Sequence, residues 1–363
     1  MTRIVTFGEI MGRLTPPGHN RLRQGLPGVL NVAFAGAEAN VAASLAMLGA
    51  DAAFVTALPK HAIADACAAT LAGLAIDTRH VVRTQEGRLG LYFLETGANQ
   101  LPTRVIYDRE RSAVSLTAAG QYDWPAVFEG AAWFHITGIT PALSCTAAEA
   151  TRAAVEAAKA DGLTVSCDLN FRNKLWRWDP SVPPRQLAEK TMRQILPYVD
   201  LVIANEEDCA DVLGIRAAQT DVEAGQLSIE RYPDVARRVV ARFSNVTRVG
   251  ITLRESLSAS HNDWGAMLYC ADDDRAHFAP TVDTTYRPYE IRNIVDRVGA
   301  GDAFAAGLIY ALLSPDLNQP ETAVRFATAA SCLAHSVPGD FNYCSRAEIE
   351  ALMHGSGAGR VVR

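Results

Sequence analysis

The sequence has little lysine and no lysine-bearing glycine loop. Its four lysines all lie outside glycine-rich segments: Lys60, Lys159, Lys174 and Lys190. A phosphate loop of the form G-x-x-x-x-G-K-[ST] is therefore absent. A dinucleotide fingerprint is absent too, because Gly299 and Gly301 come late in the chain and Phe304 occupies the third glycine position. Any phosphate would have to be held by backbone amides, arginine or a metal ion.

Metal-binding cysteine patterns and long apolar runs are missing as well. Seven cysteines are present, without a C-x-x-C pair and without histidines at metal-ligand spacing. We expect reduced core cysteines, as Cys167 within the apolar run 163–169 illustrates. No apolar run approaches the ~18 residues of a membrane span, and the first residues lack a signal-peptide pattern. We therefore expect a cytoplasmic protein without a membrane partner.

The charge pattern argues against nucleic acid as a partner. The formal net charge is −6 and the arginines are scattered, so no basic patch is formed. A chain of 363 residues, 49% hydrophobic, can bury one large core or two modest ones. The sequence shows no internal repeat and no low-complexity linker. We expect a single domain over residues 1–363.

The most informative stretch is 296–302, a glycine-rich turn that opens a helix. The run 291–295 predicts a strand end, and residues 303–313 place apolar side chains on one helix face. The first N–H groups of such a helix have no internal partner, and the helix dipole favours an anion beside them. Gly299 and Gly301 let the backbone approach that anion.

Asp302 is an unusual residue for a site that binds only an anion. A carboxylate repels phosphate unless it has a task, and one such task is to accept the proton of a hydroxyl that attacks phosphorus. The alternative is that Asp302 only caps its helix. The turn by itself leaves both interpretations open.

The whole stretch, through Gly307, resembles the C-terminal signature of the ribokinase-like (PfkB) carbohydrate kinases. That resemblance implies an anion hole at Gly299, Ala300 and Gly301 for the γ-phosphate of ATP, with Asp302 as catalytic base. It covers nearly the whole chain and is closest in form to the 2-keto-3-deoxygluconate kinases. The implied reaction is ATP-dependent phosphorylation of the primary hydroxyl of 2-keto-3-deoxygluconate.

The same resemblance implies the architecture and the cofactors. The fold would be an α/β, three-layer domain with a mainly parallel central sheet and a small β-sheet lid from about residues 10–35 and 88–115. Lids of this family often pair, so a homodimer through the lid is expected. Mg²⁺ would accompany ATP, and a monovalent cation is a further candidate.

An early glycine segment opens another helix. Gly36-Ala37-Glu38-Ala39-Asn40 leads into residues 41–48, which have apolar helical spacing. Judged by position, Asn40 is a first-turn cap. The resemblance implies instead that Gly36, Glu38 and Asn40 hold hydroxyls of the sugar.

Residues 89–95 and 103–108 predict two strands of a hairpin. Tyr107 and Arg109 are two residues apart, so they project from one face and would suit a ligand with a carbonyl or carboxylate. The alternative is an exposed arginine that packs on the tyrosine. The resemblance implies that Tyr92, Tyr107 and Arg109 face the sugar acid, and that Asp340 closes over it.

From residue 131 on, strands and helices alternate. Thr146 with Glu149 predicts a capping box, and His135, inside an apolar run, is expected to be a core residue. The strand 163–169 ends at Asn170 and Arg172, where ligands of open parallel sheets collect. Arg172 is either a surface loop residue or, as the resemblance implies, a binding and charge-stabilising residue, with Asn170 beside the nucleotide.

Two further segments resemble nucleotide-binding parts of the family, each with a departure. Acids after Asn205 suit a helix N-terminus without any other function, but the family has an N-x-x-E motif here that orders magnesium through water, and Asp208 replaces its glutamate. Near Thr252, Arg254 stands where the family has glycine. Either Arg254 reaches the nucleotide phosphates or the loop is rebuilt.

Two other functions are compatible with parts of the sequence: a kinase of a neutral sugar and a non-catalytic sugar-acid sensor. A fructokinase or ribokinase would share the glycine turn, although a neutral sugar has no use for a fixed guanidinium at Arg109. A non-catalytic sugar-acid sensor would explain the departures at Asp208 and Arg254, whereas the intact turn argues against it. The gluconate and galactonate forms of the acid are not distinguished by the sequence.

Overall fold

Parallel strands form the middle layer of the protein. Within residues 2–205, 207–216 and 231–355, which the computed structural model describes, the central sheet has nine strands in the order β14-β13-β12-β11-β10-β9-β1-β4, with β17 paired to β13. Within this sheet, neighbouring strands are parallel along the series β4, β1, β9, β10, β11 and β12. Strand β13 is antiparallel to its three neighbours, β12, β14 and β17. Their bounds are β1 Arg3–Phe7, β4 Asp51–Val55, β9 Ala131–Thr137, β10 Thr164–Asp168, β11 Leu201–Ala204, β12 Arg248–Ser258, β13 His261–Cys270, β14 Arg275–Ala279 and β17 Tyr289–Arg292.

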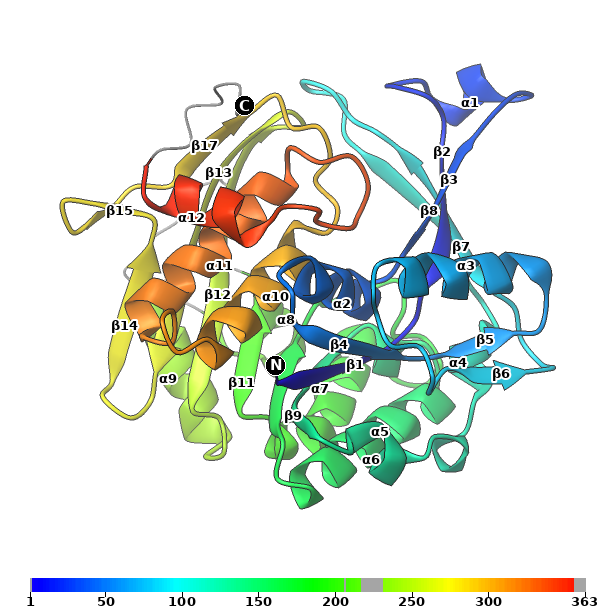
Figure 1. Cartoon of the computed structure of the whole chain (residues 1–363), viewed down its shortest axis with the longest axis horizontal. Coiled ribbons are helices and arrows are strands. Elements are labelled where there is room, and N and C mark those ends of the chain that lie inside the picture. Colours follow the sequence, from blue (N-terminus) through cyan, green and yellow to red (C-terminus); the bar gives the residue numbers. More distant parts are fainter. Residues whose placement is uncertain (1, 206, 217–230, 356–363) are drawn as a thin grey trace.

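Helices cover both faces of this sheet, which confirms the predicted three-layer α/β fold (Figure 1). On β11, Leu201 and Ile203 belong to the core on one face and Val202 and Ala204 to the core on the other, as the two-residue period of a strand requires. One face carries α2 Ala37–Met47, α3 Ala62–Gly73, α10 Ala300–Leu313, α11 Pro320–Ala334 and α12 Arg346–Met353. The other carries α4 Ala113–Leu116, α5 Trp124–Phe128, α6 Cys145–Ala160, α7 Pro184–Ile195, α8 Asp208–Leu213 and α9 Tyr232–Arg242.

Helix α10 is largely enclosed by other helices. It packs between α2 and α11 and, apart from Asp302 in its first turn, is apolar on all sides, as a helix surrounded by protein requires. A Cβ at Gly307 would lie 3.0 Å from the Cα of Ala327, so a side chain here would require α11 to move away by a few tenths of an ångström. The buried helix fixes its first turn in the interior, next to the carboxyl ends of the parallel strands.

A four-stranded sheet projects beyond the layers, in the order β3-β2-β7-β8 (Figure 1). Its members are β2 Met11–Thr15, β3 Asn31–Ala35, β7 Gly90–Glu95 and β8 Arg104–Asp108, with α1 Leu22–Gly25 between β2 and β3. We call it the small sheet. It confirms the predicted hairpin and lies within the ranges predicted for the lid. The remaining strands are short: β5 Ala57–Pro59, β6 Val82–Thr84, β15 Thr281–Val282 and β16 Thr285–Tyr286.

Local predictions were confirmed at some residues and wrong at others. The capping box at Thr146 is wrong: α6 begins at Cys145, and the hydroxyl of Ser144 accepts the amide of Ala147 at 2.9 Å. His135 is fully buried and bonds Ser166, as a core histidine does. The cysteines are unpaired and mostly buried, but Cys145 is exposed. Among the described helices, none is long and apolar enough to span a bilayer.

Candidate active site

A cavity of ≈ 370 Å³ opens at the carboxyl ends of the parallel strands, where the small sheet meets the first turn of α10. Every predicted site residue except Glu38 lines it. The lining therefore brings together segments from the whole length of the chain, from residue 9 to residue 340. This agrees with the rule that ligands of open parallel sheets collect beyond the carboxyl ends of the strands.

The glycine turn begins α10 as the sequence predicts. Gly299 is the N-cap residue, with φ 86°, a left-handed conformation that favours glycine. A side chain there would also collide with the carbonyl of Asp340. Ala300, Gly301 and Asp302 form the first turn, whose amides have no acceptor within a helix. Three N–H groups and the positive end of the helix dipole thus adjoin the cavity.

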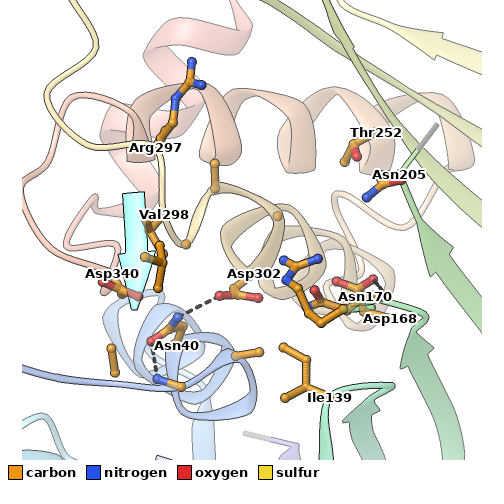
Figure 2. Close-up of a pocket in the computed structure, with 18 of the residues that line it drawn as sticks. Asn40, Ile139, Asp168, Asn170, Asn205, Thr252, Arg297, Val298, Asp302 and Asp340 are labelled. Atoms are coloured by element: carbon orange, nitrogen blue, oxygen red, sulfur yellow. Dashed lines mark hydrogen bonds between the residues drawn. The ribbon is translucent and has the colours of Figure 1, made fainter. Parts of the chain in front are cut away.

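Asp302 does not cap its helix, so that alternative is wrong. Its carboxylate makes no capping hydrogen bond; instead, Nδ2 of Asn40 donates to its Oδ2 at 2.7 Å (Figure 2). The side chain is buried, and burial raises the pKa of Asp302 to about 7, although the Asn40 hydrogen bond lowers it. A buried carboxyl with a pKa near neutrality can exchange a proton with a ligand at physiological pH.

Asn40 is oriented by its own helix. Its Oδ1 accepts the amide of Gly36, the N-cap of α2, at 3.2 Å, and this fixes which end of the side-chain amide faces Asp302. Asn40 thus bonds the N-cap residue of α2, although no ordinary side-chain capping bond begins that helix. Asn40 both closes the start of α2 and supplies a donor to the carboxylate of α10.

Glu38 is the predicted site residue that is absent from the cavity lining in the described chain. It is fully buried and accepts the hydroxyls of Thr137 at 2.7 Å and Thr140 at 2.9 Å. Burial raises the pKa of Glu38 to about 6. These contacts join α2 to the end of β9, so the observed geometry gives Glu38 a supporting position behind the cavity.

Polar groups gather where β10 and β11 end. Asp208 is buried, and its two carboxylate oxygens accept the amides of Phe171 and Asn205, both at 3.0 Å. Arg172 is an exposed loop residue that also lines the cavity, and its charge lowers the pKa of Asp302. Asn170 lies beside it, with φ 39°.

Asp168 is a cavity residue that sequence reasoning did not single out. Burial, together with the nearby Asp208 and Asp302 carboxylates, holds the pKa of Asp168 well above its ordinary value. Its place at the last position of β10 was the available signal. The described residues contain no group of three or more histidine, cysteine or acidic side chains arranged to hold a metal directly.

The small sheet supplies the other wall of the cavity. Arg109 lies 5.3 Å from the ring centre of Tyr107, but it is buried, so the interpretation as an exposed arginine is wrong. Its guanidinium forms an ion pair with Glu9, a lining residue that sequence reasoning missed. The charge of Arg109 is therefore balanced, while its Nε has no partner.

The opposite end of the cavity is formed by β12 and β13. At Arg254, where the family has glycine, β12 continues as a long strand to Ser258. The loop is therefore rebuilt as an antiparallel hairpin of β12 and β13. Thr252 and Arg254 both line the cavity. Arg297, not singled out from the sequence, also lines it, and burial and the charge of Arg254 lower the pKa of Arg297. Its guanidinium points away from Asp302 (Figure 2).

Tyr92 and Asp340 contact one another. The hydroxyl of Tyr92 donates to Asp340 at 2.8 Å, and the guanidinium of Arg13 pairs with both Asp340 and Asp296. All of these side chains are buried. Arg13 and Asp296 carried no sequence signal of a shared site, because 283 residues separate them.

The arrangement suits the transfer of an anionic group to a hydroxyl. Amides at a helix start can hold the anion, a carboxylate with a pKa near 7 can take the hydroxyl proton, and Arg172 adds positive charge.

Comparison with known proteins points the same way. The sequence pattern described as "pfkB family carbohydrate kinase" matches residues 1–235 and 276–346. A 2-dehydro-3-deoxygalactonokinase of Haloferax volcanii is 32% identical over 98% of this chain and 98% of its own. The crystal structure of a 2-dehydro-3-deoxygluconokinase from Thermotoga maritima superposes with a TM-score of 0.87 at 43% identity, covering 98% of this chain and 100% of that one. A fructokinase from Xylella fastidiosa with bound ATP, 23% identical over 97% and 98% of the two chains, shares the fold with a TM-score of 0.73.

Proposed function

This chain belongs to the pfkB family of carbohydrate kinases, and from that premise we propose that it phosphorylates 2-keto-3-deoxygluconate at its primary hydroxyl, with ATP as donor. The product would be 2-keto-3-deoxy-6-phosphogluconate. Relatives named for the gluconate and for the galactonate form of the acid both support a keto-deoxy sugar acid as substrate. The named Thermotoga maritima neighbour, at 43% identity, favours the gluconate form.

One observation carries the proposal: Asp302, with a pKa of about 7, lies in the same helical turn as the amides that adjoin the cavity. A general base must reach the acceptor hydroxyl while the anion site holds the group in transfer. In our proposal Asp302 removes the proton of the primary hydroxyl, and the oxygen attacks the γ-phosphorus of ATP in line. The amides of Ala300 and Gly301 and the charge of Arg172 would stabilise the transferring phosphoryl group.

The small sheet would hold the acid. Arg109 keeps N–H donors beyond the one it gives to Glu9, and Tyr107 lies beside it. A carboxylate or keto oxygen placed there would receive charge-assisted hydrogen bonds. Gly36, Asn40 and Tyr92 line the adjoining wall and are the candidates for contacts with the hydroxyls.

Mg²⁺ fits the residues at the ends of β10 and β11 only through water. Mg²⁺ keeps several waters and commonly binds through one or two carboxylates and substrate phosphates. Asp168 and Asp208 are the candidate carboxylates, and Asn170, Asn205, Thr252 and Arg254 line the same part of the cavity as candidate nucleotide contacts. When bound, the ion would neutralise charge on the phosphates.

An ADP-release assay over a panel of acceptors tests the proposal. We expect turnover with 2-keto-3-deoxygluconate, a smaller rate with its galactonate epimer and little with fructose or ribose. Turnover that favours a neutral sugar would support a fructokinase or ribokinase instead. Binding of the acid without ADP release from any acceptor would indicate a sensor.

We also propose a homodimer through the small sheet. Its outer residues include Val32 on β3 and Ile106 on β8, which are 64% and 55% exposed. Exposed apolar residues on edge strands favour association. Light scattering should give twice the chain mass for the wild type and the single-chain mass for Val32→Lys. Val282→Lys, on β15, is the matched control and should remain dimeric; a monomeric wild type would contradict the proposal.

A further inference from the structure

Arg13 connects the small sheet to the turn that begins α10. It lies on β2 in register with Tyr92 on β7, so the two side chains emerge side by side. Arg13 is only 5% exposed, and its guanidinium reaches out of the sheet to pair with Asp296 through one nitrogen and Asp340 through the other. The planar fork of arginine presents a separate nitrogen to each carboxylate in a fixed geometry, which the single ammonium of lysine does not reproduce.

Each of these carboxylates fixes a different part of the active site. Asp296 accepts the amides of Val298 and Gly339, both at 3.2 Å, and so holds the residues that lead into the glycine turn. Asp340 accepts the hydroxyl of Tyr92, and its carbonyl lies against Gly299. The position of the anion-binding turn therefore depends on two carboxylates that share one guanidinium.

The energetic consequence is strong coupling between the small sheet, which carries Arg13, and the turn that begins α10. Asp296 and Asp340 are buried at 7% and 8% exposure, and without Arg13 they would be left as like charges near one another. Two unpaired carboxylates are unfavourable in a poorly hydrated interior. The segments that carry Asp296 and Asp340 would therefore shift, or one of the two carboxylates would take up a proton. Arg13 does not line the cavity of the active site but a neighbouring cavity of ≈ 640 Å³, together with Asp296 and Gly339.

We propose that Arg13 is a positioning residue for phosphoryl transfer: from the small sheet it holds the anion-binding turn and Asp340 in their working places. This inference rests on the proposed kinase function. It makes docking of the small sheet a condition for a complete site, because the guanidinium that orders the turn belongs to that sheet. A site assembled in this way would be complete only when the wall that holds the acid is also in place.

The first test compares Arg13→Gln with Arg21→Gln. Arg21 precedes α1, between β2 and β3, and forms a 3.1 Å ion pair with Glu95 on β7, so its variant removes a guanidinium beside the small sheet without touching the turn. We expect kcat to fall about 10- to 100-fold in Arg13→Gln, as for a displaced catalytic group, and to stay near wild type in Arg21→Gln. The dissociation constant of ADP should change little in either variant. Equal kcat values in a folded Arg13→Gln and the wild type would overturn the inference.

Chemical rescue separates a lost charge from general damage. In Arg13→Ala, guanidinium ions at concentrations far below denaturing ones can enter through the neighbouring cavity and should restore kcat severalfold, while Arg21→Ala should not respond. No restoration in a folded Arg13→Ala would assign the loss to disturbed packing and overturn the proposal. If neither variant folds, Arg13→Lys keeps the charge without the fork: a reduced kcat supports the inference, and wild-type kcat contradicts it. Absence of turnover in the wild type would instead refute the proposed function.

Discussion

At the scale of single residues, Asp302 combines burial, a hydrogen bond from Asn40 and a place in the first turn of α10. Because burial favours the protonated form of a carboxyl, the side chain holds its proton more tightly than an exposed aspartate does. This property suits a base that must take a proton and later release it. The proposed role of Asp302 as a base can therefore be tested by a substitution that keeps its shape and removes its charge.

Asp302→Asn should abolish turnover while the protein still folds and binds. Asparagine keeps the size and an oxygen that can accept from Asn40, but it cannot take the hydroxyl proton. We expect kcat to fall about 10²- to 10⁴-fold, the usual contribution of a general base, with ligand affinities retained. Asp316→Asn, at the exposed pair with Arg346, is the control. A variant at position 302 with a third or more of wild-type kcat would rule out this role.

The thermal stability of the same variant has a defined sign. The folded pKa of Asp302 is raised to about 7, so the folded state loses stability as pH rises from the unfolded pKa through that value. Above neutral pH the wild type carries a buried charge that asparagine lacks. The melting temperature of Asp302→Asn should therefore equal or exceed that of the wild type at pH 8.

The pH dependence of kcat/KM tests the pKa directly. The base must be deprotonated, so kcat/KM should fall about tenfold per unit as pH decreases below about 7. The hydrogen bond from Asn40 lowers the pKa of Asp302, so Asn40→Ala should move this acidic limb to higher pH. An acidic limb that stays at the same pH in Asn40→Ala would show that another group titrates.

Arg109→Ala should weaken binding of the keto acid and leave binding of ATP unchanged. Loss of a charge-assisted hydrogen bond is expected to raise KM for the acid about 10- to 100-fold. The substitution also leaves the buried Glu9 carboxylate without its partner, so stability should fall. The double variant Glu9→Gln/Arg109→Gln should recover stability without recovering KM. Loss of ATP affinity with an unchanged acid KM would show that the small sheet does not hold the acid.

At the scale of elements, the small sheet is the part that we propose closes over the substrate. It projects beyond the layers (Figure 1). All four of its strands line the cavity, through Met11, Ala35, Tyr92 and Tyr107. If it closes as a lid, saturating keto acid should protect residues 89–109 from hydrogen exchange. Residues 62–73 of α3 are the internal control and should not respond. Protection confined to the region around Gly299 would contradict a lid that closes on the substrate.

The elements themselves were largely predictable, because their signals are local. The buried strands at 163–169 and 199–204, the hairpin at 89–108 and the helix after Gly299 follow from apolar periodicity and turn residues. The capping box at Thr146 failed because Ser144, two residues earlier, offers an equally good cap. The hairpin of β12 and β13 was missed because its turn falls in a polar stretch without apolar alternation, although pairs such as Ser256 with Asn262 are only six residues apart.

At the scale of the whole molecule, the sequence could indicate single residues of the site but not their partners. The pairs Arg109 with Glu9 and Arg13 with Asp340 join residues 100 and 327 positions apart. Only the topology of the sheets brings them together, and no local pattern records it. Glu38 shows the converse: the family resemblance implied a contact with the sugar, but in the fold its carboxylate bonds Thr137 and Thr140.

The central claim is that the protein transfers phosphate from ATP to the primary hydroxyl of a keto-deoxy sugar acid. Phosphorus-31 and carbon-13 NMR of one reaction with 2-keto-3-deoxygluconate, ATP and Mg²⁺ tests it most directly. The account predicts one ADP for each new phosphate monoester, with the ester on C6, and product formation about a hundredfold or more slower with the Asp302→Asn enzyme. Phosphate on another carbon, or an unchanged acid beside phosphorylated fructose or ribose in a competition mixture, would contradict it.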